Sequence, residues 1–108
     1  MGGAAARPTG RAPDGAADGR ARIRLDKWLW HARVLRTRSA CAALVAEGYV
    51  RLNGVPVARP AQPVGPGDVL TLPAGTAVRV LRILACGSRR GPAAEARGLY
   101  SELPPPGG

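Results

Sequence analysis

The sequence has few of the residues that form metal or redox sites: two cysteines, Cys41 and Cys86, and one histidine, His31. The cysteines lie far apart and neither has a second cysteine nearby, so we expect two reduced thiols and not a disulfide or a zinc site. His31 could not complete a plausible metal site with these partners. We therefore expect neither a metal nor a cofactor.

Long apolar runs are also missing. No stretch approaches the roughly 20 apolar residues that a membrane span requires, and the N-terminal residues lack the apolar segment of a secretory signal. We therefore expect no membrane association and a cytoplasmic location.

Acidic residues are scarce, seven against sixteen basic ones. Those outside the N-terminal segment are scattered and show no paired-carboxylate spacing for acid–base catalysis; they are Asp26, Glu47, Asp68, Glu95 and Glu102. Ser39 lacks the surroundings of a nucleophilic serine, and no glycine-rich nucleotide motif is present. Asp68 follows Gly67 in a predicted turn, where a structural carboxylate is expected. We expect no enzymatic activity.

What the sequence does have is arginine. The formal net charge is +9 for 108 residues, and fifteen of the sixteen basic residues are arginine, whose planar fork suits bidentate contact with phosphate. A charge excess of this kind predicts partners and not a fold. Nucleic acid is the favoured partner, and an anionic membrane surface or an acidic protein is the alternative.

A chain of this length holds one small domain. Residues 1–21 are rich in Gly, Ala, Arg and Pro without an apolar period, which predicts a disordered leader. The final residues, 104–108, are Pro and Gly only, and we expect a disordered tail there. The ordered part should span residues 22–103, and we expect it to be monomeric.

Apolar residues spaced as one helical stripe predict a first helix; they are Leu25, Trp28, Leu29, Ala32 and Leu35. Asp26 lies in its first turn, where a carboxylate favours the helix dipole. Thr37 is a suitable N-cap for a second helix over residues 38–47, and Gly48 is a suitable C-terminal cap. We expect the two helices to join through a very short turn at Arg36 and Thr37.

After Gly48 the apolar period changes from that of helices to that of strands. We expect strands at residues 49–52, 55–57, 69–72 and 77–84, with Asn53 and Gly54 forming a tight hairpin turn. Pro56 should lie at a sheet edge, and residues 92–99 should form a short helix. The predicted fold class is α+β, with two N-terminal helices on a small, mostly antiparallel sheet and a short C-terminal helix.

Positive charge is concentrated around the predicted helices. Residues 22–38 carry a net charge of +5, opposed only by Asp26, from Arg22, Arg24, Lys27, Arg33, Arg36 and Arg38. Helical geometry places Lys27 and His31 away from the apolar stripe. The short turn should bring Arg33, Arg36 and Arg38 to one corner, beside the backbone amides that begin the second helix. The alternative is that these charges only solvate the helices; clustering of one sign favours a phosphate site.

Trp30 should project from the polar side of the first helix. It could stack on a base or sugar, or the segment with Leu99 and Tyr100 could fold over it, which we favour. Arg89 and Arg90 could extend the basic surface or simply solvate a loop.

These residues resemble a known pattern, the S4-type RNA-binding domain. The resemblance is carried by RLDKWLW at residues 24–30, Ala32-Arg33, RTR at 36–38, GYV at 48–50, LNG at 52–54, Pro60, Val64 and Gly67-Asp68. The DKWLW string, together with RRGPAAEA at 89–96 before Leu99-Tyr100, is similar to the fifteen-kilodalton heat-shock protein family, a ribosome-associated branch of this fold. The resemblance covers residues 22–102.

The resemblance implies that residues 22–85 form an S4 domain and that residues 86–103 are an extension packed on it. It further implies docking on structured rRNA of the free large ribosomal subunit that still carries peptidyl-tRNA, in rescue or recycling of stalled subunits. The alternative is a general structured-RNA or DNA-binding module without ribosome specificity. The implied RNA-binding residues are Arg22, Arg24, Lys27, Arg33, Arg36, Thr37, Arg38, Arg51, Asn53 and Gly54, with Trp30, Arg59, Arg89 and Arg90 as further candidates.

The sequence departs from the family pattern at two places. The second helix has Ala42 where relatives commonly have a basic residue. The hairpin continues as Val55-Pro56-Val57-Ala58, with only Arg59 beyond it. We therefore expect fewer phosphate contacts from the hairpin.

Overall fold

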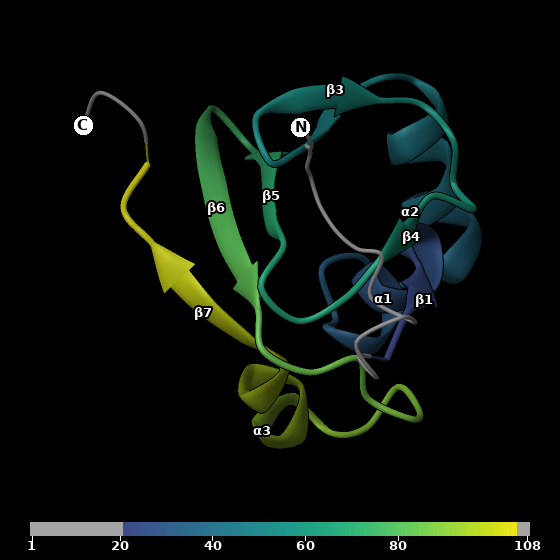
Figure 1. Cartoon of the computed structure of the whole chain (residues 1–108), viewed down its shortest axis with the longest axis vertical. Helices are drawn as coiled ribbons and strands as arrows, with labels where there is room; N and C mark the ends of the chain where they lie inside the picture. Colours follow the sequence, from purple (N-terminus) through teal and green to yellow (C-terminus); the bar gives the residue numbers. More distant parts are fainter. Residues whose placement is uncertain (1–20, 106–108) are drawn as a thin grey trace, which may run out of the picture.

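A computed structural model describes residues 21–105 of the chain (Figure 1). The predicted leader lies almost entirely outside the described residues, as does the end of the predicted tail. The described elements are β1 (Ile23–Arg24), α1 (Leu25–His31), α2 (Arg38–Ala46), β2 (Val50–Leu52), β3 (Val55–Val57), β4 (Pro63–Val64), β5 (Val69–Ala74), β6 (Ala77–Ile83), α3 (Ala93–Ala96), a 3-10 turn (Arg97–Leu99) and β7 (Tyr100–Leu103).

Five strands form the main sheet in the order β3-β2-β5-β6-β7, and β1 and β4 form a separate two-stranded pair. All of these pairs are antiparallel. Figure 1 shows α1 and α2 together at one side of the molecule and β7 at the other, with α3 below them. The α+β class and its helix order are as predicted.

The core lies between α1, α2 and one face of the main sheet. Side chains alternate along β5 and β6, so that Leu70, Leu72, Leu81 and Ile83 are buried while Arg82 faces outward. They pack in one cluster with Leu25, Trp28 and Leu29 of α1. This cluster is the scaffold that fixes the two helices on the sheet.

The connection between the helices is longer than predicted. Helix α1 ends at His31, and Ala32 caps it. Arg33 then adopts the left-handed conformation with φ 59°, and the amides of Arg33 and Val34 bond to the carbonyls of Trp30 and Leu29, at 3.1 and 3.0 Å. This Schellman pattern ends the helix at His31, four residues before the apolar period ends at Leu35. Leu35 still packs against the core, but it does so from the connection.

The second helix agrees with its predicted signals. The Thr37 hydroxyl accepts a hydrogen bond from the Ala40 amide at 3.1 Å, which satisfies one of the unpaired amides at the helix start. At the other end Gly48 has a φ of 83° and its amide bonds to the Val45 carbonyl. The hairpin turn also forms as predicted, since Asn53 and Gly54 both have positive φ. Pro56 lies on the edge strand β3.

Strands β1, β4 and β7 were not predicted. The first two have only two residues each, too few for an alternating pattern. Strand β7 continues from the 3-10 turn and pairs with β6 from Ile83↔Tyr100 to Val80↔Leu103. The last part of the described chain therefore completes the main sheet.

Candidate nucleic-acid interface

Asp26 holds two arginines at the start of the helix pair. Its carboxylate is nearly buried, with 3% of the residue exposed, and it accepts hydrogen bonds from Nε and Nη2 of Arg24, both at 3.0 Å. Nε of Arg38 lies 3.9 Å from the same carboxylate. The side chains of Arg24 and Arg38 remain 51% and 43% exposed. One buried acid thus fixes the Arg24 guanidinium with two hydrogen bonds and attracts that of Arg38, while both side chains keep about half of their surface open to solvent.

The contact with Asp26 changes the pKa of Arg24. The hydrogen bond to Asp26 and then its negative charge raise the pKa of Arg24, so this guanidinium stays charged at every physiological pH. Its fixed orientation, with donors to spare, suits a second anion on the solvent side. We call Arg24, Lys27, Arg33, Arg36 and Arg38 the helix-pair surface.

Arg33 ties the connection between the helices to the C-terminal extension, residues 86–103. Its Nε donates a hydrogen bond to the Gly91 carbonyl at 2.6 Å. A non-glycine residue in the left-handed conformation is strained by about 1–2 kcal/mol, so this bond helps to hold Arg33 there. The residue stays exposed, and the rest of its guanidinium is available to a ligand.

Trp30 is covered by the same extension, but not by the residues we expected. The Arg90 guanidinium lies over its ring, 5.9 Å from the centroid, and Arg90 Nη2 donates to the Leu35 carbonyl at 3.4 Å. Tyr100 instead packs edge-on against Trp28, with ring centroids 6.4 Å apart. Trp30 is half-buried, so one part of it remains open to solvent.

His31 lies inside the protein, contrary to its predicted position on the polar side of the first helix. Only 2% of it is exposed, and Nδ1 is 3.2 Å from the Cys86 carbonyl. Trp28 Nε1 donates to the neighbouring Ala85 carbonyl at 2.9 Å. The extension crosses this side of α1, which is why a position that is polar by helical spacing becomes buried.

The hairpin residues fall into two groups. Asn53 has a structural role: its side-chain amide nitrogen donates to Asp68 at 3.1 Å, and its side-chain amide oxygen accepts from the backbone amide of Val69 at 2.9 Å. Asp68 also accepts from the Gly65 amide, which supports the structural role predicted for it. Gly54 supplies the turn. Arg51 and Arg59, by contrast, are exposed.

Within residues 21–105, most of the predicted binding arginines lack an acidic partner. Among residues 21–105, the salt bridges pair Arg24 and Arg38 with Asp26, Arg79 with Glu102, and Arg89 with Glu95. Arg89 is therefore neutralised locally, whereas Arg90 belongs to the packing on Trp30. The predicted bases that remain exposed without a carboxylate partner in this described part are Arg22, Lys27, Arg33, Arg36, Arg51 and Arg59.

The cysteines offer no alternative chemistry. Both are free, and burial is the main cause that raises the pKa of each thiol. A raised pKa keeps the thiol protonated and unreactive. Within residues 21–105, no group of three His, Cys, Asp or Glu side chains is placed to hold a metal ion, and no helix has the length and apolar character to cross a bilayer.

Sequence reasoning treated Asp26 only as a residue that favours the helix dipole and missed its role in orienting Arg24 and Arg38. Its position two residues after Arg24 gave a weak signal, because an extended residue followed by a helix start can bring such side chains together. Gly91 binds Arg33 through its backbone carbonyl, and such a contact leaves no signal in residue type.

Comparison with known proteins defines the class of this fold. A family model, that of the S4 domain, matches residues 23–70. The chain is 39% identical over 80 residues to heat shock protein 15 of Escherichia coli K12 and, equally, to the heat shock protein 15 homolog of Haemophilus influenzae, with 74% of this chain covered. It spans about three-fifths of the length of these relatives, 59% and 60%.

A solved structure agrees in both sequence and shape. It is described as a trimeric structure of Vibrio cholerae heat shock protein 15; its chain is 38% identical, superposes with a TM-score of 0.72, and the match covers 77% of this chain and 83% of that one. The chain carries an S4 domain. It belongs to the heat shock protein 15 family.

Proposed function

We propose that this chain is a non-catalytic RNA-binding protein that docks structured rRNA through the helix-pair surface. The observation that carries the proposal is the arrangement around Asp26, where one buried carboxylate pairs with two half-exposed guanidiniums. Lys27 of α1 and Arg33 and Arg36 of the connection that leads to Arg38 are exposed as well. Membership of a family built on the S4 domain supports the same class of partner.

The physical case rests on geometry as well as charge. A flexible arginine loses side-chain entropy when it binds a phosphate, but Arg24 and Arg38 are already restrained by Asp26. A phosphate can therefore add to a partly prepared site. Folded RNA presents phosphates at several angles, and a cluster on two helix ends and their connection fits such a surface better than a straight duplex.

The finer proposal is that the rRNA belongs to the free large ribosomal subunit that still carries peptidyl-tRNA, and that the protein acts in rescue or recycling of stalled subunits. It follows from the family resemblance, and it places the protein in the cytoplasm. The expected monomer stays a prediction, since the similar Vibrio cholerae protein is described as trimeric.

Sedimentation of cell extract through a sucrose gradient tests the finer proposal. We expect the protein to migrate with large subunits, and the variant with Arg33→Glu and Arg36→Glu to move to the top fractions. A wild-type protein confined to the top fractions would contradict ribosome docking.

Competition binding tests the broader proposal, that the protein binds structured rRNA. Structured rRNA should displace a labelled rRNA fragment more effectively than duplex DNA of equal length and charge. Equal competition would indicate a general electrostatic binder of nucleic acids without preference for ribosomal RNA.

A further inference from the structure

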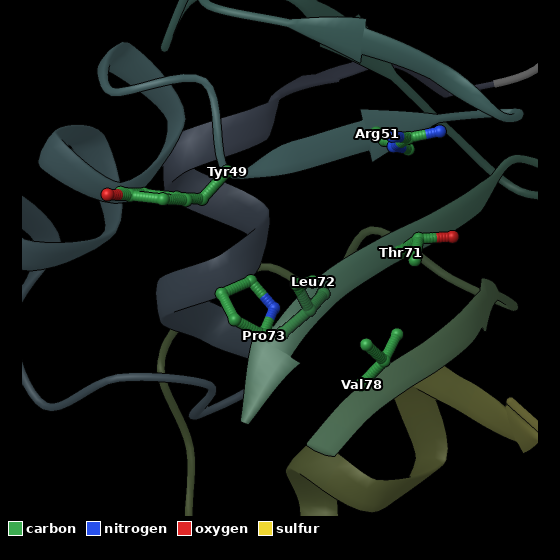
Figure 2. Close-up of a pocket in the computed structure, with 6 residues that line it drawn as sticks. All are labelled: Tyr49, Arg51, Thr71, Leu72, Pro73 and Val78. Atoms are coloured by element: carbon green, nitrogen blue, oxygen red, sulfur yellow. The ribbon is translucent and has the colours of Figure 1, made fainter. Parts of the chain in front are cut away.

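A small hollow lies on the main sheet, and none of its lining residues belongs to the helix-pair surface (Figure 2). Its volume is about 170 Å³, and its lining is almost entirely apolar. The lining residues are Tyr49, Arg51, Thr71, Leu72, Pro73 and Val78. Figure 2 shows Arg51, Thr71 and Val78 on three neighbouring strands, with Tyr49 and Pro73 beside them.

Strand register explains why these side chains share one face. Arg51 pairs with Thr71 across β2 and β5, and Pro73 pairs with Val78 across β5 and β6. Thr71 and Pro73 alternate with the buried Leu70 and Leu72, so they point away from the core. Tyr49, two residues before Arg51, falls on the same side. The hollow thus lies on the sheet face opposite the core.

The composition of this face indicates a flat, anionic ligand. Tyr49 is 59% exposed and Val78 44% exposed, unusually open for large apolar side chains that lie together. Arg51 is exposed and has no carboxylate partner in the described part of the chain. Arg82 points outward from β6, is also exposed, and likewise has no carboxylate partner among these residues. An aromatic ring with unpaired arginines nearby is the combination that binds unpaired nucleotides.

Charge also argues against a second copy of the chain as the occupant. Each chain carries a net charge of +9, and no acidic residue lines the hollow. Pairing two such faces would bring arginines together and bury them without partners, which is strongly unfavourable. The size excludes a bulky ligand, because pockets for drug-sized molecules and cofactors hold roughly 300–1,000 Å³.

We propose that this sheet face binds one unpaired nucleotide of single-stranded RNA, with the base in the hollow against Tyr49 and a flanking phosphate on Arg51. The inference extends the proposed RNA binding and adds to it a second site with a different ligand. The helix-pair surface binds folded RNA, and the sheet face binds a single unstacked base.

Fluorescence anisotropy with a labelled hexauridylate, an RNA without stable structure, tests the second site. Tyr49→Ala should weaken binding of this probe at least about fivefold, because stacking on an aromatic ring contributes strongly to each bound base. Tyr49→Phe keeps the ring and should bind within about twofold of wild type. Arg51→Gln should also weaken binding of the probe. Arg97→Gln, the matched control for charge, should not, since Arg97 is exposed and lies outside both surfaces.

A structured rRNA hairpin whose loop bases are all paired or stacked, measured in parallel, separates this site from the proposed function. Tyr49→Ala should leave hairpin affinity unchanged, and Arg33→Glu with Arg36→Glu should lower it. If Arg33→Glu with Arg36→Glu left hairpin affinity unchanged, the helix-pair surface would be overturned and the sheet site would not. Unchanged hexauridylate affinity in Tyr49→Ala would overturn the sheet site. Sedimentation equilibrium showing a wild-type oligomer that Tyr49→Ala dissociates would also overturn it, in favour of a second copy.

Discussion

Asp26 and Arg24 form a bidentate ion pair at the N-terminus of the first helix, with both hydrogen bonds at 3.0 Å and the acid almost completely buried. Arg24 directly precedes α1 and Asp26 lies in its first turn, and the same carboxylate lies 3.9 Å from Nε of Arg38, the first residue of α2. One carboxylate therefore connects the starts of both helices. This relationship joins the stability of the fold to the orientation of the proposed binding groups.

Asp26→Asn should reduce both properties. The amide keeps the shape but loses the charge, so the free energy of unfolding should fall by about 1–3 kcal/mol, at or below the range for breaking buried pairs because both arginines are half exposed. RNA affinity should fall several-fold, since Arg24 and Arg38 would no longer be held. Denaturant unfolding and RNA titration measure the two effects. Glu47→Gln, an exposed acid at the end of α2, is the control; equal values for the two variants would contradict the role of Asp26.

Arg33→Glu combined with Arg36→Glu should lower affinity for structured rRNA at least tenfold. If five phosphates are engaged, the log–log dependence of affinity on salt has a slope of roughly −4, and loss of two contacts should make it shallower by about 2. Because Arg33 also bonds to Gly91, the single change Arg36→Glu distinguishes ligand contact from altered packing. Wild-type affinity in the folded double variant would show that RNA binds elsewhere.

Arg90→Ala should uncover Trp30. The guanidinium over the indole ring and its bond to the Leu35 carbonyl would both be lost, and acrylamide should then quench tryptophan fluorescence more strongly. Trp28 is fully buried and should contribute little to the change. Arg89→Ala serves as the control, because Arg89 pairs with Glu95 and not with the indole. Identical quenching of the two variants would rule out Arg90 as the cover.

Gly87→Ala should destabilise the protein by about 1–3 kcal/mol. Gly87 has a φ of 74°, and an added Cβ would lie 3.1 and 3.2 Å from the two methyl carbons of Leu99. The left-handed conformation alone costs a non-glycine residue roughly 1–2 kcal/mol. Gly98→Ala is the matched control, because nothing lies within 4 Å of its added Cβ. A similar melting temperature for both variants would disprove the tight packing at Gly87.

Strand β7 should be sensitive to acid through Glu102. Its hydrogen bonds with Arg79, at 2.9 and 3.0 Å, lower the pKa of this carboxyl below the ordinary value of 4.5. A lowered folded-state pKa stabilises the protein above pH 4.5, and this contribution is lost as the pH falls through the lowered value. Because both side chains are partly exposed, 31% for Arg79 and 49% for Glu102, Glu102→Gln should cost no more than about 1 kcal/mol at pH 7.

The comparison of wild type and Glu102→Gln by denaturant unfolding at pH 7 and pH 3 measures this effect. We expect a difference at pH 7 that becomes smaller at pH 3. A difference that is unchanged between the two pH values would assign it to packing and not to the charge.

Local signals in the sequence predicted the elements that local physics determines. The Thr37 cap, the Gly48 end and the Asn53-Gly54 turn each depend on residues within a few positions, and all three formed as expected. The end of α1 was missed because Arg33 occupies a backbone conformation usually reserved for glycine. No local rule places an arginine there, and its bond to Gly91 comes from a segment far along the chain.

The residues of the candidate site stay a prediction from sequence, and their arrangement could not be predicted from it. Charge counting located the basic segment around Arg33 and Arg36. It could not show that Arg24 and Arg38 share one acid, or that Arg90 covers an indole, since both depend on tertiary packing. The buried position of His31 has the same cause, because helical spacing cannot anticipate a segment that folds over the polar side.

The two edges of the main sheet bear on how this protein could associate with other chains. Edge strand β3 contains Pro56, which has no amide hydrogen to donate, and edge strand β7 is followed directly by Pro104 and Pro105. Prolines at such places discourage strand addition, the route by which exposed edges recruit other chains into amyloid-like stacks. Any self-assembly of this protein should therefore proceed through side chains and leave the backbone ladder unextended.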